Sequence, residues 1–340
     1  MSDTLKWNYF PLKKEFNHSF NLSSFKLLVI LILLFTLSLF KVFSDKKEIT
    51  IKNNLEKAKS NSDSLIWNNI KHDFEILVNK YKYLIKKEEN IDEKSMIWVM
   101  WYQGIENAPP IVKSCIQSII VNREKHPVYI ISKNNLDKYI KLPDFVIEKF
   151  NEGKLSIQHF SDIIRFALLH KYGGYWIDAT YFINTPLTNV NTSFFTLKLK
   201  YCWTHSHPFI DCSYSINFMA VPKNSFIATY GYNALIYYLK KYQYFISYLL
   251  LDYIIYIALI NVPEFKEIID TLPYVTCDIF SLDGKLNLDY NKSDFCSFNK
   301  LRKISLYELK NGKNLTNYGY IIDKYKFNSK KYDINYIVNL

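Results

Sequence analysis

The stretch that decides the fold is SDIIRFALLHKYGGYWIDAT, residues 161–180. Its first part has the apolar spacing of a helix, and Ser161 is a short polar residue able to cap the start of that helix. Gly173 and Gly174 are predicted to end the helix, where a residue with positive φ is favoured. The residues that follow, YWID, read as a buried strand that ends at Asp178.

Three charged residues of this stretch are candidates for catalysis. Asp162 and Arg165 lie three positions apart and therefore share one face of the helix. Asp178 is expected at the carboxyl end of a central strand, where ligands bind in α/β sheets. Taken alone, Asp162 and Arg165 would be read as a surface ion pair, but the glycine pair and the strand-end acid together indicate a site. Arg can make forked hydrogen bonds to phosphate, and a strand-end carboxylate can hold a divalent metal.

The flanking segments alternate between strand and helix patterns. Residues 96–102 and 127–132 read as strands, and helices are predicted from residue 110, over 134–140 and over 144–150. This alternation predicts an α/β fold with a mostly parallel sheet flanked by helices. Trp101 and Gln103 then fall at the carboxyl end of the first strand, although spacing alone reads Trp101 as a core aromatic.

Composition limits the partners. The excess of 43 Lys+Arg over 32 Asp+Glu gives a net charge of +11, which favours anionic partners. The lysines are scattered and form no stripe with aromatics, so nucleic acid is not an expected partner. Five cysteines without a CxxC indicate neither a zinc site nor a complete disulfide framework, and Cys202–Cys212 is an open alternative as a pair. His205 and His207 form no more than a weak metal pattern.

The N-terminal region predicts a membrane anchor. Residues 27–40, LLVILILLFTLSLF, are apolar and lie between Lys26 and Lys41. With flanking apolar residues, the segment is long enough to span a bilayer. We expect an N-terminal tail at 1–24, a transmembrane helix at 25–43, a stalk or packing helix at 44–95 and a catalytic domain at 96–340. The count of flanking cations favours a catalytic domain on the cytoplasmic face of the membrane, and the Golgi lumen is the alternative.

Residues 161–180 closely resemble the donor site of the capsular polysaccharide synthesis family of glycosyltransferases, which is related to sugar transferases with a DxD motif and to glucosylating clostridial toxins. IWVMWYQGIENAPPIVKSCIQSI, residues 97–119, resembles the opening strand and helix of that family. The resemblance implies a glycosyltransferase-A fold and a UDP- or GDP-sugar as donor. It further implies a glycan acceptor on a polysaccharide, glycolipid or glycoprotein, and retention of anomeric configuration.

The resemblance also assigns roles to residues. Asp162, Arg165 and Asp178 match the catalytic positions, and Trp101 matches an aromatic that stacks on the nucleotide base. Donor binding is assigned to a set at the same sheet edge: Trp101, Gln103, Asp162, Arg165, Trp176 and Thr180.

The expected metal depends on Asp178. This residue matches the first acid of DxD, so Mn²⁺ or Mg²⁺ is expected there. Thr180 stands where the second acid would be, which makes a weaker metal site than two carboxylates.

Two other functions remain open. One is a membrane-tethered, catalytically inactive protein that binds nucleotide sugars, which Thr180 supports. The other is a nucleotidyltransferase, but the phosphate loop that it would need near the first strand is not visible, because Gln103 and Gly104 are closely followed by Glu106.

Overall fold

The computed structural model describes residues 64, 67–68, 70–87, 89–92, 94–187, 190, 192–200, 214–243, 245–302 and 316–328. The chain divides into two compact units, Met1–Lys59 and Ser60–Leu340, and all described residues belong to the second. The predicted tail and anchor lie outside the described residues, as do Cys202, Cys212, His205 and His207. Within the described part, no helix has both the length and the apolar character needed to cross a membrane.

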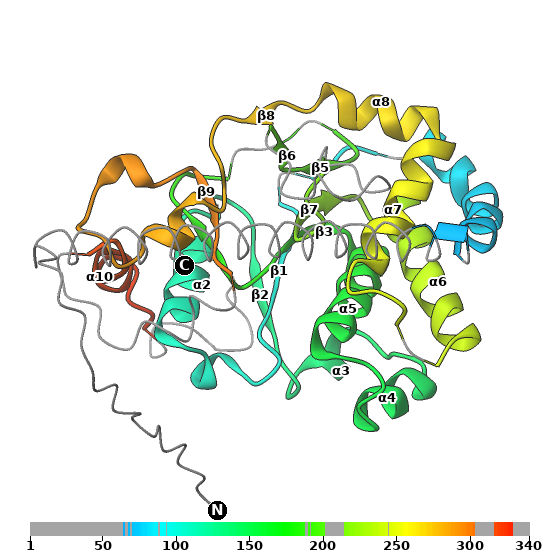
Figure 1. Cartoon of the computed structure of the whole chain (residues 1–340), viewed down its shortest axis with the longest axis horizontal. Helices are drawn as coiled ribbons and strands as arrows, with labels where there is room; N and C mark the ends of the chain where they lie inside the picture. The colour runs from blue at the N-terminus through cyan, green and yellow to red at the C-terminus, as the bar shows by residue number, and fades with distance from the viewer. Residues whose placement is uncertain are drawn as a thin grey trace, which may run out of the picture. The chain divides into compact units, whose positions relative to one another are not determined.

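A five-stranded sheet with the strand order β2-β1-β3-β7-β5 forms the centre of the second unit (Figure 1). Its strands are β1 Ile97–Met100, β2 Val128–Ile131, β3 Gly174–Ile177, β5 Phe195–Thr196 and β7 Phe218–Val221. β1 pairs in parallel with β2 and with β3, whereas β7 is antiparallel to both β3 and β5. Four strands therefore share one direction and β7 opposes them, which confirms a mixed α/β fold with a parallel-rich sheet.

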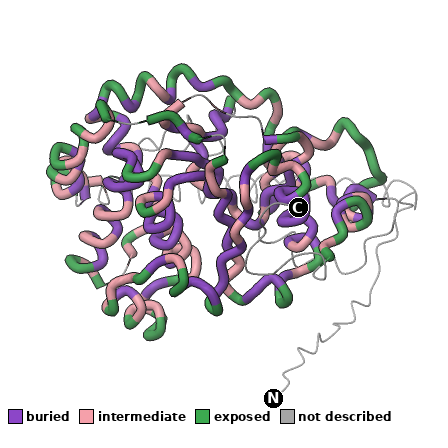
Figure 2. Tube along the Cα trace, turned by 180° about the vertical axis from the view of Figure 1, so that it is seen from behind, coloured by how far each residue is buried: buried purple, intermediate pink, exposed green. Residues whose placement is uncertain are grey.

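The sheet separates two apolar clusters because successive strand residues point to opposite faces. Trp98 and Trp176 face one cluster together with helices α5 Ile157–Tyr172, α6 Phe226–Lys241 and α7 Leu250–Asn261. Ile97 and Tyr175 face the other, which contains α2 Pro110–Val121 and residues of α10 Asn317–Lys324. Figure 1 shows α2 and α10 on one side of β1 and β3 and α5 to α7 on the other. Buried residues run through these central elements, and exposed ones lie on the outer turns (Figure 2).

The remaining elements surround this centre. α3 Leu136–Tyr139 and α4 Asp144–Asn151 follow β2, close to the predicted helices. Residues 70–81 are helical and lead into η1 Lys82–Lys87, and the buried side chains of this helix join the cluster that contains α6. The other short elements are η2 Ile105–Asn107, β4 Tyr181–Ile183, β6 Lys198–Leu199, α8 Pro263–Thr271, β8 Tyr274–Val275, η3 Ser281–Lys285, η4 Lys292–Asp294 and β9 Phe298–Lys300.

Helix α5 begins one turn earlier than predicted. Its N-cap is Ser156, whose hydroxyl accepts a hydrogen bond from the His159 backbone N–H. The prediction of Ser161 as the cap was wrong, because Phe160 is buried and stacks on Phe150 with ring centroids 4.1 Å apart. That packing holds the preceding turn in the helix.

The glycine pair after α5 is required by both conformation and space. Gly173 has φ +70° and Gly174 has φ +93°, values that other residues rarely adopt. A Cβ on Gly174 would lie 2.2 Å from the Met96 carbonyl oxygen. The two glycines therefore let the chain turn sharply from α5 into β3, as the sequence predicted.

Candidate functional site

The carboxyl ends of β1 and β3 form the edge of the sheet that carries the candidate site. These strands are parallel neighbours with Trp98 opposite Trp176. Trp101 follows β1 and Asp178 follows β3, so the two residues emerge at the same edge. α5 leads into β3 through the glycine turn, which places its Arg165 within reach of Asp178.

Arg165 is the centre of the site. Its side chain is only 5% exposed. Nη2 lies 3.2 Å from Asp162 Oδ1 and 3.3 Å from Asp178 Oδ1, and Nη1 donates to the Ile216 carbonyl oxygen at 2.9 Å. The guanidinium also lies over the Trp176 ring, 5.2 Å from its centroid. The structure thus brings together all three predicted catalytic residues, Asp162, Arg165 and Asp178.

Asp178 accepts hydrogen bonds at both carboxylate oxygens. Oδ1 accepts from Trp176 Nε1 at 2.8 Å as well as from Arg165, and Oδ2 accepts from Lys300 Nζ at 2.6 Å. Burial would raise the pKa of Asp178, but Lys300, Arg165 and Trp176 together lower it below its ordinary value. Asp178 is therefore an ionised carboxylate throughout the physiological range.

Lys300 belongs to the site although sequence reasoning missed it. β9 pairs with β4 so that Lys300 lies opposite Tyr181. This pairing brings the Lys300 ammonium to Asp178 and, at 2.8 Å, to the hydroxyl of Thr180. No local signal in the sequence could have found it, because Lys300 is one of many lysines and lies 122 positions from Asp178.

Asp252 is a second residue that sequence reasoning did not assign to the site. It lies in the first turn of α7 and interacts electrostatically with Arg165. A carboxylate within the apolar run LLDYIIYIALI was the available signal. Burial raises the pKa of Asp252 to about 7, although Arg165 acts in the opposite direction.

The pKa of Asp162 is also raised to about 7. Burial is the main cause, Asp178 and Asp252 raise it further, and Arg165 lowers it. When Asp162 and Asp252 are protonated, the site holds Arg165 and Lys300 as cations and Asp178 as an anion. The resulting single positive charge suits an anionic ligand such as a diphosphate.

The other predicted donor-site residues differ in how far they are buried and in their hydrogen-bond partners. Trp101 is half-buried, and its Nε1 is buried without a hydrogen-bond partner among the described residues. Gln103 is exposed, and its carbonyl accepts a hydrogen bond from Asn107. Trp176 is 1% exposed, so this residue orients Asp178 from within the core. Thr180 is half-buried beside Lys300.

His159 lies in the first turn of α5, near the charge cluster in sequence but not part of it. Its ring stacks on Phe245 with centroids 3.8 Å apart, and burial lowers its pKa. This packing agrees with a structural role.

The divalent metal expected at Asp178 would need oxygen atoms that are free to act as ligands. Both oxygens of Asp178 already accept from cationic side chains, and the Thr180 hydroxyl also accepts from Lys300. Over the described ranges, no group of three or more His, Cys, Asp or Glu side chains is placed to hold a metal. This arrangement does not fit a metal site, because a cation at Asp178 would have to displace Lys300.

A disulfide and a cavity lie near the strand that carries Lys300. Cys277 and Cys296 form a disulfide, a pair that sequence analysis did not propose.

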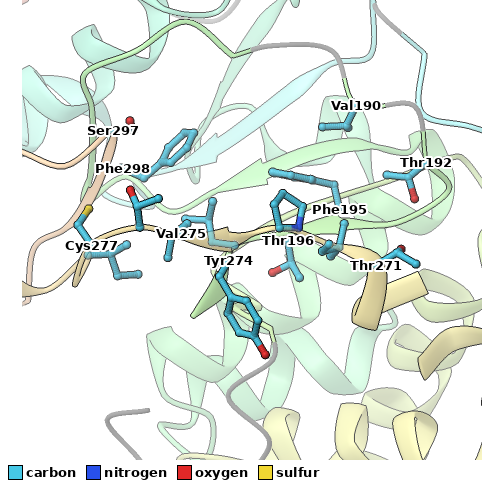
Figure 3. A pocket seen from close by; sticks show the side chains of 15 residues that line it. Val190, Thr192, Phe195, Thr196, Thr271, Tyr274, Val275, Cys277, Ser297 and Phe298 are labelled. Atoms are coloured by element: carbon cyan, nitrogen blue, oxygen red, sulfur yellow. The ribbon is translucent and has the colours of Figure 1, made fainter. Parts of the chain in front are cut away.

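A cavity of about 570 Å³ is lined by residues of β5, β8 and β9, including Phe195, Val275 and Phe298 (Figure 3). Phe298 lies two residues before Lys300 on the same face of β9.

Comparison with known proteins places this arrangement in a family. Residues 45–325 match the family described as "Capsular polysaccharide synthesis protein". The chain belongs to this family. The family resemblance of residues 97–119 and 161–180 is thereby confirmed.

Two further similarities concern individual proteins. The chain is 32% identical over 99 residues to the O-glycosyltransferase braB of Annulohypoxylon truncatum, a match that covers 26% of this chain and 23% of the relative. The chain thus spans about a quarter of that protein's length. Among solved structures, it is similar to "PaToxG Glycosyltransferase" with a TM-score of 0.39 and 14% identity, covering 63% of this chain and 83% of the other.

Proposed function

We propose that this capsular polysaccharide synthesis family member is a glycosyltransferase that uses a UDP- or GDP-sugar donor. The observation that carries the proposal is the charge cluster at the sheet edge, where Arg165 and Lys300 flank the ionised Asp178. The buried Arg165 and the half-buried Lys300, both beside the Asp178 carboxylate, suit a nucleoside diphosphate, whose phosphates carry negative charge. Family membership and the glycosyltransferase name of the relative support the same reaction class.

Each residue of the site contacts a different part of the donor in this proposal. Trp101 is half-buried at the carboxyl end of β1, and the exposed part of its ring can stack on the base. Arg165 and Lys300 offset charge on the diphosphate, and Asp162 accepts hydrogen bonds from sugar hydroxyls. Trp176 and Ile216 position Asp178 and Arg165 through their hydrogen bonds.

We propose transfer with retention of configuration. The bond between the sugar C1 and the diphosphate oxygen breaks, and its electron pair stays on that oxygen. The acceptor hydroxyl oxygen bonds to C1 and gives its proton to the departing phosphate oxygen. The cations beside Asp178 stabilise the negative charge that develops on the leaving group.

The acceptor is proposed to be a glycan on a polysaccharide, glycolipid or glycoprotein at a membrane, as in the synthesis of a capsule or cell-surface polysaccharide. The Cys277–Cys296 disulfide favours an oxidising compartment over the cytoplasmic face, which supports the lumenal alternative. Alkylating free thiols at the moment of cell lysis tests this location. A disulfide-linked peptide pair supports the lumen, and two alkylated cysteines support the cytoplasm.

Turnover of donor by the purified full-length protein tests the function. UDP- and GDP-sugars are supplied with glycan acceptors, and nucleotide release is measured for wild type and for Asp178→Asn. The expected result is release from one donor class and a loss of about 100-fold in the variant. Lys266→Ala, on an exposed face of α8, is the control. Binding of a nucleotide sugar without any turnover would instead favour the inactive binding protein.

A further inference from the structure

The Lys300 ammonium lies between the first and third residues of the turn that replaces a DxD motif. It donates to Asp178 Oδ2 at 2.6 Å and to Thr180 Oγ1 at 2.8 Å. An ammonium has three N–H bonds, so one remains for a ligand once these two contacts are made. Lys300 thus links the two positions that would share a metal in a DxD site.

The Lys300 side chain is held in this place by its surroundings. It is 13% exposed and lies over the Tyr181 ring at 5.1 Å. The Lys300 backbone N–H donates to the Ile279 carbonyl at 2.7 Å, and the next residue, Leu301, donates to the Thr180 carbonyl at 3.0 Å. The Leu301 bond extends the β4–β9 pairing and holds the end of β9 against the turn that contains Asp178, while the Lys300 bond ties β9 to the segment before η3.

A DxD motif with its bound divalent metal and the Asp178–Lys300 pair have the same net charge. Two carboxylates and a divalent cation sum to zero, and so do one carboxylate and one ammonium. Replacing the second acid by Thr180 removes one negative charge, and Lys300 in place of a divalent metal removes one positive charge. The two departures from the DxD pattern therefore compensate each other.

We propose that Lys300 takes the role of the divalent cation, so that this protein binds its donor diphosphate without a metal. The inference deepens the proposed function and rests on it for the identity of the ligand. As the C1–oxygen bond breaks and its electron pair moves onto the phosphate oxygen, the Lys300 ammonium donates a hydrogen bond to the diphosphate. Lys300 keeps its proton throughout, and the acceptor's proton leaves with the diphosphate.

Titration of the full-length protein with Mn²⁺, followed by electron paramagnetic resonance, tests the proposal independently of turnover. The expected result is no bound Mn²⁺ in wild type. The double variant Thr180→Asp/Lys300→Ala, which restores two acids and removes the ammonium, should bind Mn²⁺. Mn²⁺ that binds to wild type and is lost in Asp178→Asn would overturn the proposal.

Calorimetric titration with UDP and with GDP supplies the second measurement. Wild type should bind one of them with the same affinity in EDTA and in Mn²⁺. Lys300→Met should weaken that binding by about 10- to 100-fold, because a charged donor to phosphate is lost. Lys285→Met is the matched control, since Lys285 also pairs with an aspartate, Asp294, in the same C-terminal region. Binding that requires Mn²⁺, or unchanged binding by Lys300→Met, would contradict the proposal.

The two measurements separate failure of the inference from failure of the proposed function. If wild type binds neither nucleotide, the donor class is wrong, and the Mn²⁺ titration still decides whether Lys300 excludes the metal. If Lys300→Met does not fold, Lys300→Arg retains the charge and should still bind nucleotide in EDTA. Mn²⁺-dependent binding by Lys300→Arg would count against the proposal.

Discussion

Arg165 on helix α5 and Asp178 at the end of β3 form an ion pair with 3.3 Å between Nη2 and Oδ1. Nη2 also lies 3.2 Å from Asp162 Oδ1, and Nη1 donates a hydrogen bond to the Ile216 carbonyl oxygen. One guanidinium therefore holds two carboxylates in a half-buried setting. The stability of this region and its capacity for anions both depend on that side chain.

Arg165→Met is expected to lower the free energy of unfolding by about 1–3 kcal/mol, because Asp162, Asp178 and the Ile216 carbonyl lose a charged hydrogen-bond donor. Arg165→Lys keeps the charge but not the fork, so it should be less destabilising and still lower donor turnover by about 100-fold. Urea denaturation and kcat/KM measure the two effects. The exposed Lys266→Ala should change the stability by about 0.5 kcal/mol or less. An Arg165→Met variant as stable as wild type would contradict the assigned role.

The raised pKa of Asp162 predicts a pH dependence of stability. Its pKa is about 7 in the folded protein, against about 3.9 for an unperturbed aspartate. Between these values the folded state binds one more proton than the unfolded chain, so this contribution to stability is lost as pH rises. Asp162→Asn removes the contribution, and the stability difference between wild type and the variant should fall from pH 4 to pH 7.

Asp294→Asn provides a control of opposite sign for that experiment. The hydrogen bonds from Lys285 and then Asn317 lower the pKa of Asp294. Its contribution is therefore present above the unfolded pKa and lost as pH falls. The difference between wild type and Asp294→Asn should rise with pH, and two curves of the same sign would contradict the assignment.

Gly174→Ala is expected to destabilise the protein by about 1–3 kcal/mol or more. The positive φ disfavours any Cβ, and that atom would lie 2.2 Å from the Met96 carbonyl oxygen. Gly284→Ala is the matched control, because a Cβ there meets nothing within 4 Å. Thermal denaturation of both variants should show a loss at Gly174 alone. An equal effect at the two glycines would argue against the strained turn.

Loss of the Cys277–Cys296 bond is expected to lower stability by about 3 kcal/mol, because the bond closes a loop with a sequence separation of 19. The double variant Cys277→Ala/Cys296→Ala should melt at a lower temperature than wild type. A reductant should lower the melting temperature of wild type towards that of the variant and leave the variant unchanged. Equal effects of the reductant on both proteins would show that another thiol pair is responsible.

The local features of the site could be predicted from sequence. The period of α5, the need for positive φ at Gly173 and Gly174, and the strand ending at Asp178 all arise from neighbouring residues. The cap of α5 was misplaced because Ser156 and Ser161 are chemically alike. Burial of Phe160 decides between them, and burial is a tertiary property.

The sequence by itself determined that Asp162, Arg165 and Asp178 would meet, because a helix, a glycine turn and a strand in direct succession leave few alternatives. Only the tertiary structure decided what completes the site. Lys300 is placed in the site by the pairing of β9 with β4. Asp252 lies on α7, which packs against α6. Contacts between segments so far apart in the chain depend on which surfaces pack together, and no periodicity or spacing encodes that choice. The expected metal at Asp178 rested on local residues alone, whereas the cation found there comes from a distant strand.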